Sequence, residues 1–403
     1  MRYKLIRFFD KKIGIPLCLI FYLISNILLL VRSNKPKDVK KILIIRFWGI
    51  GSLVLLSPTL EAIRKKFCNS NITLLTLCQN REVYEENNLF DKIICLDLDN
   101  LLKFPMRCIK LIHSLYNEHY EMVIDFEQFC RFSSLISFLT FSKIRIGFNT
   151  KNQCRGLLYN VPIKYDDYKH VSDAFFDIVR IFYSSDFIRL IKPQTTAEEK
   201  YKVDILLKEK NIKNDDLVIC FNINCGDYAL ERRWPKENFV QIADWIIKDL
   251  SAKIIFIGSD KENDYVEGTI KLIEDNVNVI NLCGLINIRQ LSYLFEKCTL
   301  LISNDSGPLH IGVASNIPTV SFFGPETPHK YGPIGDYHYV FYKNLPCSPC
   351  ISVFGSKSVN CKIGVKCMKT IYPHEVYNKI RNILDKIQLD VNEKRFKGFN
   401  ILQ

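Results

Sequence analysis

The residues best suited to carry out chemistry are Asp305, Ser306 and His310, which place a carboxylate, a hydroxyl and an imidazole on one short turn. The apolar run before them, residues 299–302, is typical of a buried parallel strand, and the residues after them have helical character. Ligands bind at such strand-to-helix turns, outside the carboxyl edge of an open α/β sheet. Gly307 would let the backbone approach a ligand closely, and the first amides of the helix can hold an anion. An ordinary capped surface turn has the same composition, so the rest of the chain must decide between the two interpretations.

A second turn of this kind contains two glycines, Gly49 and Gly51, after the apolar run at 41–45. Two glycines there would allow the backbone to approach an anionic group or a sugar. The turn lacks the third glycine of a dinucleotide-binding fingerprint, and no acidic residue ends the next strand near Leu77. These two departures disfavour NAD binding.

A pair of arginines, Arg232 and Arg233, follows a strand and the turn at Gly226. Arginine pairs bidentately with phosphate and would stabilise a nucleotide-diphosphate leaving group as charge builds on it. The alternative is a surface pair opposite neighbouring acids. Glu262 follows another strand, at 252–257, where a carboxylate can accept from ribose hydroxyls or favour a helix N-terminus.

Fifteen cysteines are scattered mostly through apolar runs, as buried free thiols are, which favours a reducing cytoplasm. Four near the end form a different pattern: Cys347-x2-Cys350, then Cys361 and Cys367. Four thiolates complete a tetrahedral structural zinc site, and C-x2-C is a common beginning for one. Because the second pair has five intervening residues, a zinc site, free or redox-labile thiols, and disulfides all remain open.

Short apolar runs alternate with helical patterns along the whole chain, which indicates βαβ units on parallel sheets. The expected strands are 41–45, 71–77, 92–96, 122–125, 144–147, 217–221, 252–257, 277–282, 300–303 and 318–323. The chain of 403 residues, 48% hydrophobic and 24% charged, suits two globular domains of ordinary size. We therefore expect two Rossmann-like, doubly wound domains that face one cleft.

The net charge of +12 is concentrated at the N-terminus, where residues 1–41 carry +8 and the other 362 residues carry +4. This distribution, without a nucleic-acid-binding motif, argues against a nucleic-acid partner. Residues 13–31 are apolar and uncharged, and no cleavage site of the A-x-A type follows them. Basic residues flank them on both sides: Lys11, Lys12, Arg32, Lys35 and Lys37. A spanning helix, a helix lying in the headgroup plane and a buried helix all remain open, and membrane attachment of some kind is favoured.

The order of these motifs resembles glycosyltransferase family 9, the ADP-heptose:lipopolysaccharide heptosyltransferases. The family's C-terminal signature is matched by Cys283-Gly284, 291–294, Asn304 to His310, 318–325 and 331–335. Three further blocks agree in order and spacing: 42–58, 222–235 and 254–262. The resemblance covers roughly residues 41–385 and implies the GT-B architecture.

The charge, apolar and strand patterns, together with the resemblance, predict a domain organisation. We expect a basic and apolar membrane-associating segment at 1–40, an acceptor domain at 41–190, an inter-domain region at 191–214, a nucleotide-sugar domain at 215–372, and a C-terminal helix and tail at 373–403. The final helix, near 374–387, is expected to pack back onto the first domain.

An inverting glycosyltransferase that needs no metal for catalysis is the activity implied. It would move a heptose or related sugar from a nucleotide-diphosphate sugar, with ADP-heptose as the expected donor, to a lipopolysaccharide core or another lipid-linked saccharide. The protein would be peripheral on the cytoplasmic face of a bacterial inner membrane. By resemblance, Arg232 occupies the family's phosphate-binding lysine position and Glu262 a position associated with the ribose, while Asp305 and His310 would orient the donor, with Ser306 and Gly307 beside them.

One position departs from the family, because Ser52 stands where the Gly-rich turn usually continues with the general-base aspartate. A hydroxyl of ordinary acidity cannot take the acceptor's proton unaided. Asp125 and Glu127, on a loop of the same domain, and Asp305, from across the expected cleft, are the substitutes to test. The alternative is a catalytically degenerate, saccharide- or nucleotide-binding member of the fold. A nucleotide-sugar epimerase is disfavoured because the Gly-rich fingerprint for NAD is missing.

Overall fold

The structure is a computed structural model that describes residues 10–27, 39–98, 103–183, 189–226, 229–351, 359 and 361–399. Side chains are described for all of these except 26–27 and 389–399. Residues 28–31 of the apolar segment, and Arg32, Lys35 and Lys37 beyond it, therefore lie outside the described part of the chain.

The first domain contains a parallel six-stranded sheet in the order β3-β2-β1-β4-β5-β6. Its strands are β1 (Lys41–Ile45), β2 (Asn71–Leu77), β3 (Lys92–Leu96), β4 (Met122–Asp125), β5 (Ile144–Asn149) and β6 (Val161–Lys164). The first four have the predicted bounds, because each is an apolar run between polar turns. Edge strand β6 was not predicted, since four residues that include Pro162 give little strand signal.

The second domain repeats this topology with a parallel sheet in the order β12-β11-β10-β7-β8-β9. Its strands are β7 (Val218–Asn222), β8 (Lys253–Phe256), β9 (Val279–Asn281), β10 (Leu300–Asn304), β11 (Thr319–Phe323) and β12 (His338–Tyr342). β7 and β10 are buried along their whole length, as expected for central parallel strands covered by helices on both faces. The prediction of two doubly wound α/β domains is confirmed.

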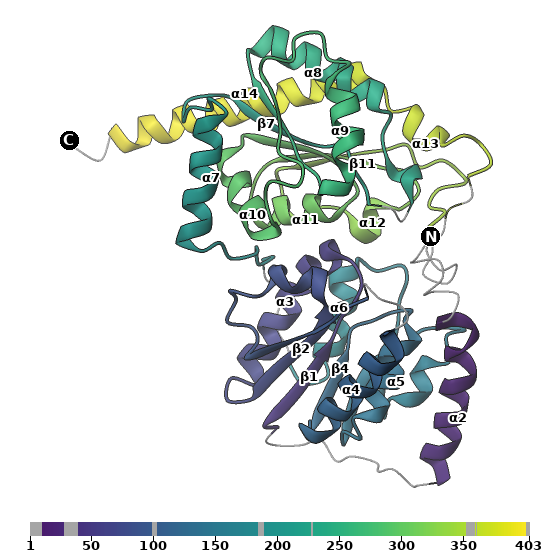
Figure 1. The fold of residues 1–403 in the computed structure, drawn as a ribbon. Helices are drawn as coiled ribbons and strands as arrows, with labels where there is room; N and C mark the ends of the chain where they lie inside the picture. The colour runs from purple at the N-terminus through teal and green to yellow at the C-terminus, as the bar shows by residue number, and fades with distance from the viewer. Residues whose placement is uncertain are drawn as a thin grey trace.

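Helices cover both sheets (Figure 1). They are α2 (Gly14–Ile27), α3 (Ile50–Lys66), α4 (Phe104–Asn117), α5 (Arg131–Leu139), α6 (Val171–Val179), α7 (Ala197–Glu209), α8 (Lys236–Leu250), α9 (Asn263–Ile270), α10 (Ile288–Lys297), α11 (Gly307–Ala314), α12 (Pro328–Tyr331), α13 (Lys366–Lys369) and α14 (Pro373–Phe399). In Figure 1, α3 and α6 of the first domain face α10, α11 and α12 of the second.

The two strand orders fix where ligand-binding loops must gather. The direction in which successive strands are added to each parallel sheet reverses between two central strands, β1 and β4 in the first domain and β7 and β10 in the second. In open α/β sheets the loops that leave such a pair diverge and leave a crevice at the carboxyl ends. The turn after β1 and the loop after β4 meet at one switch point, and the loops after β7 and β10 meet at the other.

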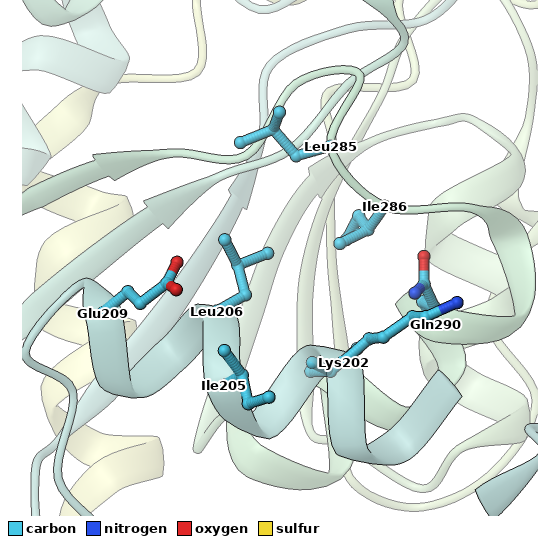
Figure 2. Close-up of a pocket in the computed structure, with 8 residues that line it drawn as sticks. Lys202, Ile205, Leu206, Glu209, Leu285, Ile286 and Gln290 are labelled. Atoms are coloured by element: carbon cyan, nitrogen blue, oxygen red, sulfur yellow. The ribbon is translucent and has the colours of Figure 1, made fainter. Parts of the chain in front are cut away.

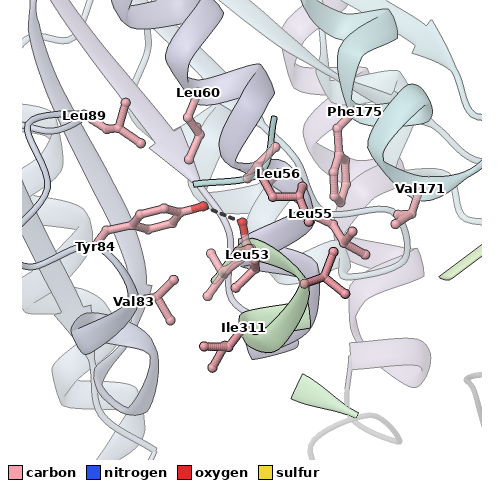
Figure 3. Close-up of a cluster of buried hydrophobic side chains, with 14 of the residues drawn as sticks. Leu53, Leu55, Leu56, Leu60, Val83, Tyr84, Leu89, Val171, Phe175 and Ile311 are labelled. Carbon is pink, nitrogen blue, oxygen red and sulfur yellow. Dashed lines mark hydrogen bonds between the residues drawn. The ribbon is translucent and has the colours of Figure 1, made fainter. Parts of the chain in front are cut away.

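Apolar packing continues from one domain into the other. The start of α3 contributes Leu53, Leu55 and Leu56 to a buried cluster, and Ile311 of α11 packs into the same cluster (Figure 3). The hydroxyl of Tyr84 donates to the carbonyl of Leu53, which ties the short turn after β2 to this helix. The two domains therefore share buried contacts at the helices that follow β1 and β10.

The expectation that the final helix packs onto the first domain is wrong. Val376 and Ile380 of α14 are buried in the core of the second domain, and the Tyr377 hydroxyl lies 2.5 Å from a carboxylate oxygen of Asp249 near the end of α8. Helix α14 packs against α8, so it completes the second domain (Figure 1).

Candidate functional site

The two switch points touch each other through glycines. A Cβ atom on Gly51 would lie 2.4 Å from Cδ2 of His310, and one on Gly307 would lie 3.3 Å from Cβ of Ile50. Gly49, which caps α3, has a φ of +86°, a left-handed conformation that favours glycine. The Gly-rich turn of the first domain and the Asp305 turn of the second are therefore in direct contact, and the glycine backbone of each packs against a side chain of the other.

Ser306 stands at the N-cap of α11 without capping it. Its Oγ atom accepts a hydrogen bond from Nδ2 of Asn222 at 2.6 Å, and the same amide nitrogen donates to Ser303 at 2.9 Å. No side-chain hydrogen bond reaches the first amides of α11 from its N-cap residue. The amide groups at a helix start lack partners within the helix and carry the positive end of its dipole; α11 offers those of Gly307, Leu309 and His310, because Pro308 has no N–H. The start of α11 can therefore receive an anion.

Arg232 lies beside this helix start as a fixed cation. Its Nη1 atom donates to the carbonyl of Asp305 at 2.9 Å and lies 3.4 Å from the Asp305 carboxylate, while Nη2 donates to the carbonyl of Cys225 at 2.5 Å. Although burial lowers the pKa of Arg232, the charge of Asp305 more than compensates and raises the pKa overall, so the guanidinium stays protonated. Its Nε atom is buried and makes no hydrogen bond within the described residues.

The backbone that carries Arg232 is held from the neighbouring strand. Asn304, at the end of β10, accepts from the amide of Trp234 at 2.9 Å and donates to the carbonyl of Ile223 at 2.8 Å. Trp234 is fully buried, stacks on Phe322 and donates from its indole nitrogen to the carbonyl of Ile371. The loop after β7 is thus fixed to β10, and the position of Arg232 follows from that.

Arg233 and Glu262 line the other side of the same sheet edge. The Arg233 guanidinium lies 4.0 Å from the centre of the Tyr265 ring and donates to Asn224 at 3.4 Å. One oxygen of Glu262 accepts from both the amide and the hydroxyl of Ser259, each at 2.8 Å, in a capping box. Glu262 therefore serves a helix start, as one of the two interpretations expected, and contact with a ribose stays a prediction. Gly226 has a φ of +68° in the same loop, whose residues 227–228 lie outside the description.

His310 is buried, and its imidazole is neutral at physiological pH. Burial, together with the neighbouring charges of His170 and Arg232, lowers the pKa of His310 to about 3. Its Nδ1 atom is buried and finds no hydrogen-bond partner in the described part of the chain. His170 begins α6 in the first domain and lies with Nε2 3.1 Å from the carbonyl of Gly332 in the second. His170 was not predictable from the sequence, because the two segments that it joins are 162 residues apart.

Asp125 is part of a buried ion pair. Its carboxylate accepts from Nη2 of Arg155 at 2.8 Å, from the hydroxyl of Tyr159 at 2.6 Å and from the amide of Glu127 at 2.9 Å. Burial raises the pKa of Asp125, although the Arg155 charge opposes this. With both oxygens occupied and the side chain fully buried, Asp125 is placed to hold the loop after β4 and is a poor candidate for a base.

Glu127 holds the start of the Gly-rich turn through hydrogen bonds with its backbone amides. One oxygen accepts from the amides of Phe47 and Trp48, at 2.7 and 3.0 Å, and lies 3.6 Å from the guanidinium of Arg46. Its other oxygen, Oε2, is buried and has no hydrogen-bond partner among the described residues. Ser52 lies in the first turn of α3, directly after this support, and is 9% exposed. The turn that carries Ser52 is therefore preorganised by a carboxylate from the neighbouring strand.

The four cysteines of the C-terminal pattern lie near one another outside the switch point. Burial, together with the other three cysteines, raises the pKa of Cys367 to about 11. All fifteen cysteines are free thiols. Over the described residues, no group of three or more His, Cys, Asp or Glu side chains is arranged to hold a metal ion. Structural zinc at Cys347, Cys350, Cys361 and Cys367 thus stays a prediction.

A pocket lies away from these residues, between α7 and the loop before α10 (Figure 2). Its lining combines the apolar side chains of Leu206, Leu285 and Ile286 with those of Lys202 and Gln290. None of the residues predicted from the sequence to do chemistry lines it.

Comparisons with known proteins agree with the two-domain fold described above. Residues 108–357 match the family model of glycosyltransferase family 9 (heptosyltransferase). The chain is 29% identical over 188 residues to lipooligosaccharide heptosyltransferase 2 of Campylobacter jejuni, a match that covers 45% of this chain and 57% of that protein. It spans about half the length of three such curated heptosyltransferases.

Two solved structures have the same fold. The glycosyltransferase family 9 protein of Veillonella parvula superposes with a TM-score of 0.73 at 23% identity, covering 87% of this chain and 98% of that one. The E. coli ADP-heptose LPS heptosyltransferase II gives a TM-score of 0.68 at 16% identity, covering 87% and 99%. The predicted GT-B architecture is confirmed.

Proposed function

This chain belongs to glycosyltransferase family 9, and we propose that it transfers a heptose or a related sugar from a nucleotide-diphosphate sugar to a lipid-linked saccharide. The acceptor proposed is a lipopolysaccharide core. ADP-heptose is the proposed donor, by similarity to the E. coli transferase whose structure has the same fold.

The observation that carries this proposal is the position of Arg232. A protonated guanidinium and the uncapped start of α11 lie together at the β7/β10 switch point. Both are suited to a diphosphate, because guanidinium groups pair with phosphate oxygens and helix-start amides donate to them. Both also strengthen as the leaving group gains charge in the transition state, so they would raise the rate as well as the affinity.

The reaction would exchange one bond at the anomeric carbon. An acceptor hydroxyl oxygen bonds to this carbon as its bond to the diphosphate oxygen breaks, and the nucleotide diphosphate leaves with the bonding electrons. Arg232 and the α11 amides would stabilise that charge without a metal ion. A base must take the hydroxyl proton, and since both oxygens of Asp125 are occupied, Glu127 and Asp305 are the carboxylates that we propose to test.

Ser52 favours one alternative, a degenerate member of the family that binds a nucleotide or saccharide and does not turn it over. Neither a serine nor the neutral His310 supplies a strong base at this turn without help. This alternative shares the donor site with the transferase, so affinity for ADP-heptose does not separate the two.

The experiment is to incubate the protein with ADP-heptose and a heptose-free lipid A–core acceptor, and to identify products by mass spectrometry. A transferase gives an acceptor heavier by one heptose residue, in amounts that grow with time. Unchanged acceptor in the presence of measurable donor binding would instead support the degenerate alternative. UDP-sugars as competing donors test the nucleotide and sugar in the same assay.

We also propose a cytoplasmic position at the inner membrane. The fifteen free thiols are consistent with a reducing compartment. A lipid-linked acceptor requires that the protein work at a membrane surface.

A further inference from the structure

Helix α2 is anchored on the first domain by its inner side. Asp10, just before it, accepts from the amides of Arg131 and Phe132 at 3.0 and 2.9 Å and so caps the start of α5. Cys18 is completely buried, and Phe21 stacks on Phe138 of α5 with ring centres 5.4 Å apart. These contacts fix which side of α2 faces outward.

The outer side of α2 is apolar as well. Ile13 before the helix and Leu19, Ile20, Leu23 and Ile24 within it are exposed, with fractions from 37 to 60%. The spacing of the four helical residues places them along one outer stripe. A helix on the surface of a water-soluble domain normally presents charged or polar residues there. An all-apolar helix is normally covered, so the outer stripe indicates a partner.

The apolar surface continues onto α4. Phe138 lies 6.2 Å from Phe141, and Phe141 lies 5.7 Å from Tyr116 at the end of α4, measured between ring centres. Along α4, Met106 and Ile109 are exposed in line with Tyr116, at the spacing of one helix face. In Figure 1, α2, α5 and α4 lie side by side on one face of the first sheet. We call the exposed apolar residues of α2 and α4, with Phe141, the apolar face.

The helices of the apolar face carry basic residues and no acidic ones, and the acids Asp97 and Glu118 beside α4 are paired with Arg107, Lys41 and Lys92. None of α2, α4 and α5 contains an aspartate or a glutamate. Lysines border it, and the exposed ones are Lys11, Lys12, Lys103, Lys110 and Lys143. Asp10 nearby is occupied with Arg131 and the start of α5. A broad apolar area bordered by cations matches a bilayer whose headgroups are anionic.

We propose that the apolar face binds an anionic lipid bilayer, with α2 lying in the plane of the headgroups and α4 as a second contact. Within the described residues, no helix is long and apolar enough to cross a bilayer. The apolar stripe of α2 would enter the boundary between headgroups and acyl chains, while the lysines pair with lipid phosphates. This proposal rests on the proposed function only for its biological purpose, which is to bring the site to a lipid-linked acceptor.

The test is flotation of the full chain with vesicles, without donor or acceptor. We expect binding to vesicles of phosphatidylethanolamine and phosphatidylglycerol, and weaker binding to phosphatidylcholine alone. Replacing two apolar residues on α2 (Leu19→Ser with Leu23→Ser) should lower the partition coefficient by about tenfold or more. The pair Met106→Ser with Ile109→Ser on α4 should lower it in the same direction. The control is Leu272→Ser with Val277→Ser, an apolar pair on the second domain that is more exposed than the α2 pair and whose replacement should change nothing.

A charge variant separates loss of docking from loss of folding. Lys11→Glu with Lys12→Glu leaves all apolar packing intact and should weaken binding to anionic vesicles at low salt. The difference in binding between this variant and the wild type should shrink at high salt. Transfer to a water-soluble acceptor fragment should be unchanged in every variant, so a failure of the transferase proposal is recognised separately. The proposal is overturned if the wild-type chain does not float with anionic vesicles, or if the α2 and α4 variants float as well as it does. It is also overturned if those variants dissociate a dimer of this chain and leave lipid binding unchanged.

Discussion

At the scale of single residues, Arg232 is the most important side chain of the proposed donor site. Its two terminal nitrogens, Nη1 and Nη2, donate to the carbonyls of Asp305 and Cys225, so the guanidinium cannot rotate freely and its position is set before any ligand arrives. The sequence pointed to this residue through the motif around it. The contacts that fix it come from residues up to 73 positions away and were not predictable from the motif.

Arg232→Ala should therefore reduce kcat/KM for sugar transfer by about 10²- to 10³-fold, the usual cost of removing one charge-stabilising donor from an active site. Arg232→Lys keeps the positive charge but loses the planar pair of N–H donors, so its kcat/KM should lie between those of the wild type and Arg232→Ala. Steady-state kinetics with varied donor concentration would measure this. Lys248→Ala, on the surface helix α8, is the control and should behave as wild type.

His310 gives a prediction about pH. The folded protein has a pKa of about 3 at this residue, below the usual histidine value of about 6.5, so the unfolded chain takes up the proton first as the pH falls. Stability from this residue is therefore complete above about pH 6.5 and declines below it, by up to ~1.4 kcal/mol per pH unit.

Urea unfolding of the wild type and of His310→Asn at pH 7, 6 and 5 would measure this effect. The wild type should lose more of its free energy of unfolding than the variant as the pH falls, so the difference between the two should change steadily with pH. A difference that is constant across this range would show that His310 takes up its proton equally in both states.

At the scale of elements, most of the fold was predictable from the sequence. Central strands such as β1 and β2 are continuous apolar runs, and their carboxyl ends carry the motif residues, so their order along the chain already located the site. Edge strands β6 and β12 and helix α4 were not predicted, because their sequences mix apolar and polar residues and only tertiary contacts define them. The placement of α14 was predicted wrongly, since nothing in its sequence says which domain offers the complementary face.

The site itself was predicted less completely than the fold. Asp125 was named as a candidate base from its place after β4, and that place is right. Its role could not be foreseen, because Arg155 and Tyr159 reach it from 30 and 34 residues further along. The support that Glu127 gives to the Gly-rich turn depends likewise on β1 and β4 being neighbours, which is a property of the sheet.

The contact between α3 and α11 supplies a prediction at this scale. Gly51→Ala places a methyl group 2.4 Å from an atom of His310, so one of the two helix starts must move. We expect a loss of about 1–3 kcal/mol of stability and a marked loss of activity. Gly268→Ala in α9 is the matched control, because nothing lies within 4 Å of the added carbon and alanine favours a helix. Thermal unfolding and kinetics of the two variants would measure both effects, and equal behaviour would show that the contact is unimportant.

At the scale of the whole molecule, two switch points are held against each other by contacts on several sides. Arg289 of α10 pairs with Glu85 of the first domain at 2.9 Å and with Glu199 of α7 at 2.7 Å. Although burial acts in the opposite direction, hydrogen bonds led by Arg289 lower the pKa of Glu199 to about 2. With the shared apolar cluster around Ile311, these contacts set the distance at which a donor on the second domain would meet an acceptor on the first.

The transferase assignment is best tested by the rate of ADP release from ADP-heptose, with and without the lipid A–core acceptor. The wild-type chain should release ADP in proportion to the acceptor present, and Arg232→Ala should lose that release while keeping its fold. Release that does not depend on acceptor, or that survives in Arg232→Ala, would contradict the assignment of a transferase whose leaving group is stabilised at the start of α11.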